Sequence, residues 1–414
     1  MKRWNEKYHD RFKHHSLSGQ LMDSRLLEES WKKVKSNRGS GGVDGETIGS
    51  FEAKKDLKLA EIRRLLKEKR YEPSPVRRVE IPKPDGRMRP LGIPTVTDRV
   101  VQQRLKDILE PIFEEIFLEG SHGYRPGKDA HQAMRKVEGY IERGYSWLVD
   151  ADIQGFFDHV NHGILMDLVR EKIADGRILD LLEAFLNCGV MKEGNFEETL
   201  EGTPQGGVIS PLLANIYLNH FDRRMGEEGF LLLRYADDFL VFCKSKEDAE
   251  KALTRTERIL GDELKLSLNY KKTRILNAKE ELGEFLGFNF TEGYLAPSKR
   301  AMNDYKDAIR LATRRSRPKN VSMVIADINP IIRGWGKYYG YRTIDMPLST
   351  LDSWTRMRVR CFKAKKRSRW IIAKRLPEER GLISLLSLRT PRPITYEGEH
   401  RMRAVYLNWV RTVR

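Results

Sequence analysis

The segment Phe230–Lys244, FLLLRYADDFLVFCK, constrains the fold of this chain more than any other. Two apolar runs flank a short acidic centre, which is the pattern of a β-hairpin with buried strands and an exposed turn. Carboxylates are rarely buried unless they are paired or bind a metal. The segment therefore predicts a sheet that presents Asp237 and Asp238 at its rim, within a fold that mixes helices and strands.

A second acidic strand end lies upstream, where SWLVDADI (146–153) reads as a buried strand that reaches Asp152. Two aspartates in a turn are by themselves ordinary turn chemistry. The apolar hairpin and the earlier strand together indicate three carboxylates that converge at one sheet edge. Mg²⁺ takes oxygen ligands, and nucleotidyl transfer uses two such ions about 3.5–4 Å apart. We expect Asp152, Asp237 and Asp238 to be catalytic and to bind two Mg²⁺ ions, with Mn²⁺ as a substitute.

The net charge of +17 is unevenly distributed. Residues 299–414 carry 28 Lys and Arg against 9 Asp and Glu, whereas residues 105–298 carry 23 against 35. Residues 1–104 are basic again, with 25 against 15. An acidic centre between two basic ends favours metal-binding carboxylates flanked by surfaces that bind a polyanion, so nucleic acid is the expected partner. A merely solvated basic surface is the alternative.

Composition argues against a membrane or secreted protein. No apolar run approaches the ~18 residues of a membrane helix, and the first ten residues lack the apolar core of a signal peptide. Cys188, Cys243 and Cys361 form neither a CxxC pair nor a zinc spacing. We expect a cytoplasmic protein, associated with a bacterial nucleoid or ribonucleoprotein.

Periodicity gives the outline of the remaining chain. Residues 21–37 and about 51–70 have helical patterns, separated by a glycine-rich loop at 39–51. Residues 76–94 alternate around Pro84-Asp85-Gly86 and predict a hairpin. After Pro297 the pattern is helical and rich in Lys, Arg and aromatic residues.

The ordered motifs of this chain resemble those of reverse transcriptases encoded by bacterial group II introns. The matching stretches are Gly42–Gly45, Ile81–Pro94 (IPKPDGRMRPLGIP), Ser121–Pro126 (SHGYRP), Asp152–Asp158 (DIQGFFD), Thr203–Asn215 (TPQGGVISPLLAN), Tyr235–Asp238 (YADD), Asn269–Ile275 (NYKKTRI), Phe285–Phe288 (FLGF) and Asn329–Tyr339 (NPIIRGWGKYY).

The resemblance implies an α+β right-hand polymerase with an antiparallel palm sheet, fingers and a helical thumb. Its expected parts are an N-terminal extension with helical fingers (1–78), fingers and palm (79–295), a maturase-like thumb (296–360) and a basic nucleic-acid-binding tail (361–414). The implied activity is RNA-directed DNA synthesis from dNTPs on a primer 3′-OH. The implied partners are an RNA template, a DNA primer, a DNA target and the parent intron RNA, whose splicing and mobility the protein would assist.

The resemblance also assigns residue roles. Lys83, Arg89, Phe157 and Gln205 would bind the dNTP, with Phe157 as the gate that excludes a ribose 2′-OH and core packing as its equal alternative. Template or primer contacts fall on Arg125, Lys272, Lys363, Lys365, Lys366 and Arg367. A salt-bridge or capping role is the alternative for Arg125, and an ordinary surface cation is the alternative for Lys83, Arg89 and Lys272.

The tail holds one cysteine and one histidine, Cys361 and His400, so it cannot supply the His and Cys metal site of the endonuclease found in many intron proteins. We therefore expect a protein of the endonuclease-lacking type. Two rival functions remain. One is a domesticated intron-like reverse transcriptase in defence, spacer acquisition or DNA repair. The other is a non-catalytic RNA-binding splicing maturase, against which the three intact aspartates argue.

Overall fold

The computed structural model describes residues 13–82, 86, 88–199, 201–364 and 377–390 and divides into two compact units. The first unit comprises Met1–Asp129 and Val149–Arg274, and the second comprises Ala130–Leu148 and Ile275–Arg414. The division falls inside two strands, β3 (Trp147–Asp152) and β8 (Arg274–Asn277). The first unit therefore holds both acidic segments that the sequence singled out.

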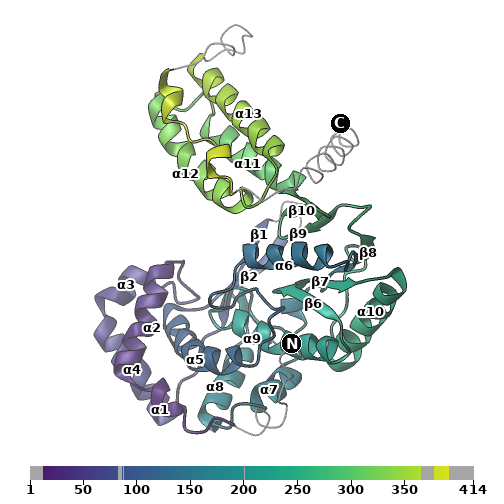
Figure 1. Ribbon diagram of the computed structural model, residues 1–414. Coiled ribbons are helices and arrows are strands. Elements are labelled where there is room, and N and C mark those ends of the chain that lie inside the picture. The colour runs from purple at the N-terminus through teal and green to yellow at the C-terminus, as the bar shows by residue number, and fades with distance from the viewer. Residues whose placement is uncertain (1–12, 83–85, 87, 200, 365–376, 391–414) are drawn as a thin grey trace. The chain divides into compact units, whose positions relative to one another are not determined.

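Four helices open the first unit and include both predicted helical segments (purple in Figure 1). They are α1 (Ser18–Leu21), α2 (Ser24–Asn37), α3 (Ile48–Ala53) and α4 (Lys55–Glu68). The Asp23 carboxylate caps α2 by accepting a hydrogen bond from the backbone N–H of Leu26. The apolar face of α2 buries Trp31, whose ring stacks on Phe51 with centroids 4.4 Å apart. Capping and amphipathic spacing thus account for this helical layer.

The predicted fingers hairpin forms and gains two strands that the sequence did not indicate. Strands β1 (Val76–Pro82) and β2 (Met88–Ile93) pair antiparallel, as expected. A second hairpin, β4 (Val190–Lys192) and β5 (Asn195–Glu197), joins them because β4 runs parallel to β1. The strand order is β2-β1-β4-β5. The loop after β5 therefore starts beside the fingers strands.

The sheet with the acidic residues has the order β6-β7-β3-β8. Its central hairpin is β6 (Leu231–Tyr235) and β7 (Asp238–Cys243), which pair antiparallel as predicted. Helix α9 (Ser210–Glu227) packs beside this hairpin, and Phe221 meets Phe239 edge-on at 5.1 Å. The unit is completed by α5 (Val96–Glu114), α7 (His162–Arg170), α8 (Gly176–Leu186), α10 (Lys246–Arg258), the 3₁₀ turn η1 (Phe156–Asp158) and the π-helical turn η2 (Ile259–Glu263). Helices and an antiparallel hairpin thus combine in the predicted α+β class.

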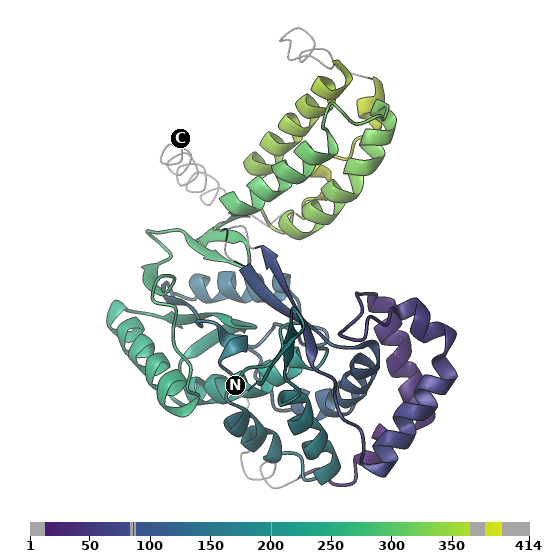
Figure 2. The ribbon, with the colours of Figure 1, turned by 180° about the vertical axis from the view of Figure 1, so that it is seen from behind.

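The second unit contains α6 (Ala130–Glu142), a small sheet and a helical bundle. The sheet consists of β9 (Gly283–Phe285), β10 (Phe288–Thr291) and β11 (Tyr294–Pro297). The bundle consists of α11 (Lys299–Ala312), α12 (Val321–Tyr339) and α13 (Asp345–Ala364), which lie side by side in Figure 2. These helices enclose their own apolar core, which includes Ile309, Ile328 and Leu351. This is the helical thumb that the sequence predicted.

The expected boundary between thumb and tail, after residue 360, falls inside α13. The following described segment, with the 3₁₀ turns η3 (Pro377–Gly381) and η4 (Leu386–Leu388), packs back on the bundle through Leu382 and Leu385. The buried Asp352 carboxylate accepts the backbone N–H groups of Leu385 and Leu386 and fixes that return. Residues 377–390 therefore belong to the thumb, because their apolar side chains are part of its core.

Within the described ranges, no helix combines the length and apolarity that a membrane crossing requires.

Candidate active site

The turn between β6 and β7 presents Asp237 at the end of the buried hairpin. Tyr235 and Asp238 are directly paired across the strands, so the loop consists of Ala236 and Asp237 alone. Ala236 has a φ of +60°, a value that two-residue hairpin turns require at their first position but that alanine adopts at a cost. The predicted tight acidic turn is therefore present, and its backbone is held in a strained conformation.

The Asp152 side chain lies at the end of β3 and is 22% exposed. Lys272 donates to its Oδ2 at 2.7 Å, and the Asn269 amide donates to the same oxygen at 3.1 Å. The Asn269 backbone N–H also donates to the Asp152 carbonyl at 2.8 Å. The segment 269–275 thus reaches the first acidic motif, and Lys272 gives Asp152 its nearest positive charge.

Four carboxylates share this edge of the sheet. Burial raises the pKa of Asp238 to about 8, and the charges of Asp150, Asp152 and Asp237 add to that rise. Burial also raises the pKa of Asp237, and the charge of Asp152 contributes. Asp152, Asp237 and Asp238 therefore lie close enough for their charges to act on one another.

Asp150 is a fourth member of the group that the sequence did not single out. It lies two residues before Asp152 and accepts a hydrogen bond from Arg274 Nε at 3.1 Å. The alternation of side chains along β3 would have indicated it, because residues two apart share a face of a strand.

The chemistry of this group suits a divalent cation. Within the described ranges, no three Asp, Glu, His or Cys side chains are already arranged for a shared ion. The carboxylates supply only oxygen donors, as Mg²⁺ prefers, and a bound cation would offset the burial and the neighbouring negative charges that raise the pKa of Asp238. Asp152, Asp237 and Asp238 are all half-buried.

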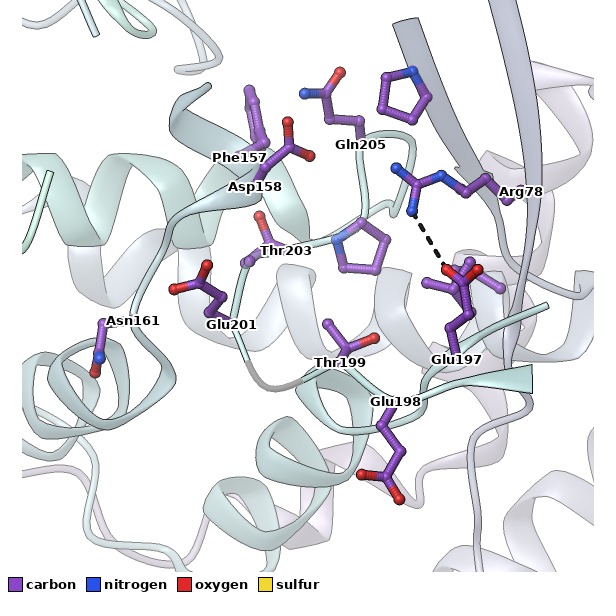
Figure 3. A pocket seen from close by; sticks show the side chains of 16 residues that line it. Arg78, Phe157, Asp158, Asn161, Glu197, Glu198, Thr199, Glu201, Thr203 and Gln205 are labelled. Carbon is purple, nitrogen blue, oxygen red and sulfur yellow. Dashed lines mark ion pairs between the residues drawn. The ribbon is translucent and has the colours of Figure 1, made fainter. Parts of the chain in front are cut away.

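The first unit also contains a cavity of about 660 Å³ (Figure 3). It is lined by residues of β1, β2, β4 and η1 and of the loop after β5, among them Arg78, Pro90, Gly92, Phe157, Asp158, Glu197, Thr203 and Gln205. Phe157 borders the cavity with 8% of its surface exposed and packs edge-on against Phe156 at 5.2 Å. Its position thus suits both the gate and the packing role.

Two of the predicted nucleotide contacts meet beside this cavity. Arg89 Nε donates to Gln205 Oε1 at 2.9 Å, although 116 residues separate them. The Gly92 backbone N–H donates to the Gln205 carbonyl at 2.7 Å, so the loop is tied to β2. Gly206 has a φ of +117°, and a Cβ there would lie 2.6 Å from the Gly92 carbonyl oxygen. Only glycine fits this approach, which fixes the position of Gln205.

Tyr124 belongs to this surface and was not predicted. Its φ is +59° and its side chain is 49% exposed. Burial raises its pKa, and the charge of Asp237 raises it further, so the phenol lies near the Ala236–Asp237 turn. The sequence around Tyr124, SHGYRP (121–126), did not indicate that this side chain would lie near Asp237.

Other predicted contacts lie elsewhere. Arg125 is buried, and its guanidinium donates to Glu114 and to the carbonyls of Leu118 and Ser121. These are the contacts of the salt-bridge role that the sequence left open. Lys363 is exposed near the end of α13. Lys83, Lys365, Lys366 and Arg367 lie outside the described residues.

Comparisons with known proteins match both parts of the chain. The family described as reverse transcriptase (RNA-dependent DNA polymerase) matches residues 81–290, just over half of the chain. The maturase-specific domain of group II introns matches residues 302–377.

The chain is also similar to individual proteins over part of their length. It is 35% identical over 289 residues to protein YkfC of Escherichia coli, and this alignment covers 60% of this chain and 76% of YkfC. It is 31% identical over 336 residues to the group II intron-encoded protein LtrA of Lactococcus lactis, which covers 65% of this chain but only 55% of LtrA. A nuclear intron maturase of Arabidopsis thaliana is 37% identical over 184 residues, 32% of this chain and 26% of that protein. The chain therefore belongs to the group II intron-encoded reverse transcriptases, with the polymerase domain followed by the maturase-specific domain of that family.

Proposed function

We propose that this protein extends a DNA primer on an RNA template by two-metal-ion nucleotidyl transfer from dNTPs. The observation that carries the proposal is the meeting of Asp152, Asp237 and Asp238 from separate parts of the sheet. The Arg89–Gln205 pair beside them supplies polar groups for a nucleotide. Primer extension by the purified protein on a poly(rA)–oligo(dT) duplex with Mg²⁺ and dTTP tests the activity. Absence of an alkali-resistant product would contradict it.

Asp152 and Asp237 would hold the ions, and Asp238 would support them through its charge. When bound, such ions stabilise the negative charge that develops at the reacting phosphate. Lys272, paired with Asp152 at 2.7 Å, would balance the charge of the group before substrate arrives. Arg89 would orient the triphosphate, because a guanidinium presents several donors to phosphate oxygens.

The cavity wall would select the nucleotide. Gln205 and the backbone at Gly206 would contact the nascent base pair, and Phe157 would contact the sugar. An aromatic ring at that position leaves no room for a 2′-OH. Sugar choice is therefore a property of this wall and not of the carboxylates.

Replacing Phe157 by Ala is expected to raise ribonucleotide incorporation relative to dNTP incorporation, on the order of tenfold or more. The measurement is the ratio of kcat/KM values for rNTP and dNTP on one primer–template. Phe156→Ala is the matched control, because Phe156 is 2% exposed and packs on the same ring without bordering the cavity. If both variants lose stability and neither changes the ratio, Phe157 serves only as core.

We further propose that the thumb and tail bind structured RNA, with the parent intron as the natural target. The support is the match of residues 302–377 to the maturase-specific domain and the excess of Lys and Arg after residue 298. Phosphate contacts release counterions, so binding should weaken steeply with salt.

Neutralising Lys363, Lys365, Lys366 and Arg367 together to Gln is expected to weaken RNA binding and to flatten its salt dependence. Each lost phosphate contact lowers the log–log slope by about 0.7 on single strands and about 0.9 on duplex. Nucleotide addition on a saturating, pre-annealed primer should persist. Filter binding at several salt concentrations measures the slope. An unchanged slope and affinity would reduce this cluster to a solubilising surface.

A further inference from the structure

Arg234 in strand β6 is a charged side chain with no exposed surface. It precedes the catalytic turn by two residues, and its neighbours Asp222, Asn215 and Ser121 are 3%, 1% and 1% exposed. All of these residues belong to the first unit. A buried charge is costly unless it is paired and fully hydrogen-bonded, so the contacts of Arg234 need a reason.

Every donor of the Arg234 guanidinium is used. Its Nε and Nη2 donate to the two carboxylate oxygens of Asp222 at 2.7 and 2.6 Å. Nη2 also donates to Ser121 Oγ at 2.9 Å. Nη1 donates to Asn215 Oδ1 at 3.0 Å and to the Ala236 carbonyl at 2.8 Å. A guanidinium has five N–H groups, so no donor is left over.

Helix α9 provides two of the partners. Asn215 and Asp222 are seven residues apart, which is two helical turns, so both face β6 from one side of α9. The Asn215 amide also donates to the Gly123 carbonyl at 2.8 Å. The network therefore joins α9, the segment that contains Ser121 and Gly123, and the turn.

Two contacts act directly on the turn. The Ala236 carbonyl is fixed by Arg234, and the Ala236 amide nitrogen lies so close to Gly123 that a Cβ at Gly123 would collide with it. Ala236 is also the residue with the costly positive φ. Such a conformation persists only where the surroundings determine it more than once.

We propose that Arg234 is a positioning residue that holds the strained Ala236–Asp237 turn in the conformation needed for metal binding. This inference rests on the proposed two-metal polymerase function. Arg234 does not touch substrate or metal. It sets where the Asp237 carboxylate lies by fixing the carbonyl of the preceding residue.

Stability alone is a weak reason for this network. Apolar side chains of similar size often replace a buried ion pair without loss of stability, whereas removing one partner leaves an unpaired charge. The double variant Arg234→Met with Asp222→Leu therefore separates the two roles. It removes both charges and the bond to the Ala236 carbonyl while keeping the volume filled.

The experiment compares this double variant with Arg234→Lys and Arg224→Met. Arg224 lies on α9, as Asp222 does, but it pairs with Glu263 and makes no contact with the turn residues in this network. It is therefore the matched control. Thermal unfolding reports the fold. Mn²⁺ binding, followed by the electron paramagnetic resonance of free Mn²⁺ without substrate, reports the metal site. Steady-state primer extension then gives kcat and the KM for dNTP.

The double variant is expected to unfold within a few degrees of the unsubstituted protein. It should bind Mn²⁺ about tenfold more weakly and lose about 10–100-fold in kcat, because mutating the residues that support metal ligands typically causes losses of this size. Its KM for dNTP should stay near normal. Arg234→Lys should fall between, because lysine keeps the pair with Asp222 but has fewer donors. Arg224→Met should match the unsubstituted protein in all three measurements.

Normal Mn²⁺ binding and normal kcat in a folded double variant would overturn the positioning role. Failure of the double variant to fold would also overturn it, because Arg234 would then be a requirement of the fold. If the unsubstituted protein neither extends primers nor binds Mn²⁺, the proposed function itself fails, and this outcome is distinct from the other two.

Discussion

Replacing Asp237 by Asn is expected to abolish cDNA synthesis while leaving RNA affinity nearly unchanged. Asparagine keeps the shape of the turn residue but removes the charge that would hold the ions. Loss of the stabilisation that a bound ion gives the reacting phosphate, several kcal/mol, corresponds to at least about 1,000-fold in rate. Asp152→Asn should behave in the same way, because the Asp152 carboxylate belongs to the same acidic group as Asp237 and Asp238.

The measurement is single-nucleotide primer extension, with filter binding of RNA on the same preparation. Asp167→Asn is the matched control, since Asp167 is an exposed aspartate of α7 whose carboxylate pairs with Arg170 of the same helix. Robust extension by either active-site variant would remove these aspartates from the chemistry. Loss of both extension and RNA binding would show that the substitution disturbs the fold.

Replacing Gly206 by Ala is expected to have the next largest effect, a loss of about 100-fold in kcat/KM for dNTP and a destabilisation of about 2–4 kcal/mol. The φ of +117° is unfavourable for alanine, and the new Cβ would meet the Gly92 carbonyl oxygen at 2.6 Å. Backbone must shift to relieve that contact. Gln205 is then displaced from Arg89, and the nucleotide site loses its alignment.

Gly194→Ala is the control for backbone strain without collision. Gly194 also has a positive φ, +88°, but a Cβ there would meet nothing within 4 Å. We expect it to cost about 1 kcal/mol in stability and to leave kcat/KM unchanged. Urea unfolding and dNTP titration of both variants decide the matter. Equal kinetic losses in the two variants would show that strain alone, and not the approach to Gly92, explains the result.

Local patterns in the sequence predicted the acidic turn and the elements around it. Two apolar runs around YADD determine the β6–β7 hairpin, because register follows from the turn and the buried face. The helical spacing of residues 21–37 and the Asp23 cap determine α2 in the same way. These elements depend on residues close together in the chain, so periodicity and turn chemistry reveal them.

Contacts between distant residues were decided by the tertiary structure alone. Periodicity could not show that β4 would pair with β1, or that residues 377–390 would return to the thumb core. Arg125 and Arg89 were both predicted to bind substrate. In the structure Arg125 is buried and pairs with Glu114, whereas Arg89 donates a hydrogen bond to Gln205 at the cavity.

The sequence by itself determined the chemistry of this protein, namely which carboxylates exist and on which strand end or turn each lies. Only the tertiary structure decided the geometry around them: the pairing of Lys272 with Asp152, the addition of Asp150 to the group and the enclosure of Arg234 behind the turn. The physical reason is that a charge can bind substrate, pair with a neighbour or support a backbone. Which of these it does depends on the partners and the water that the folded chain leaves around it.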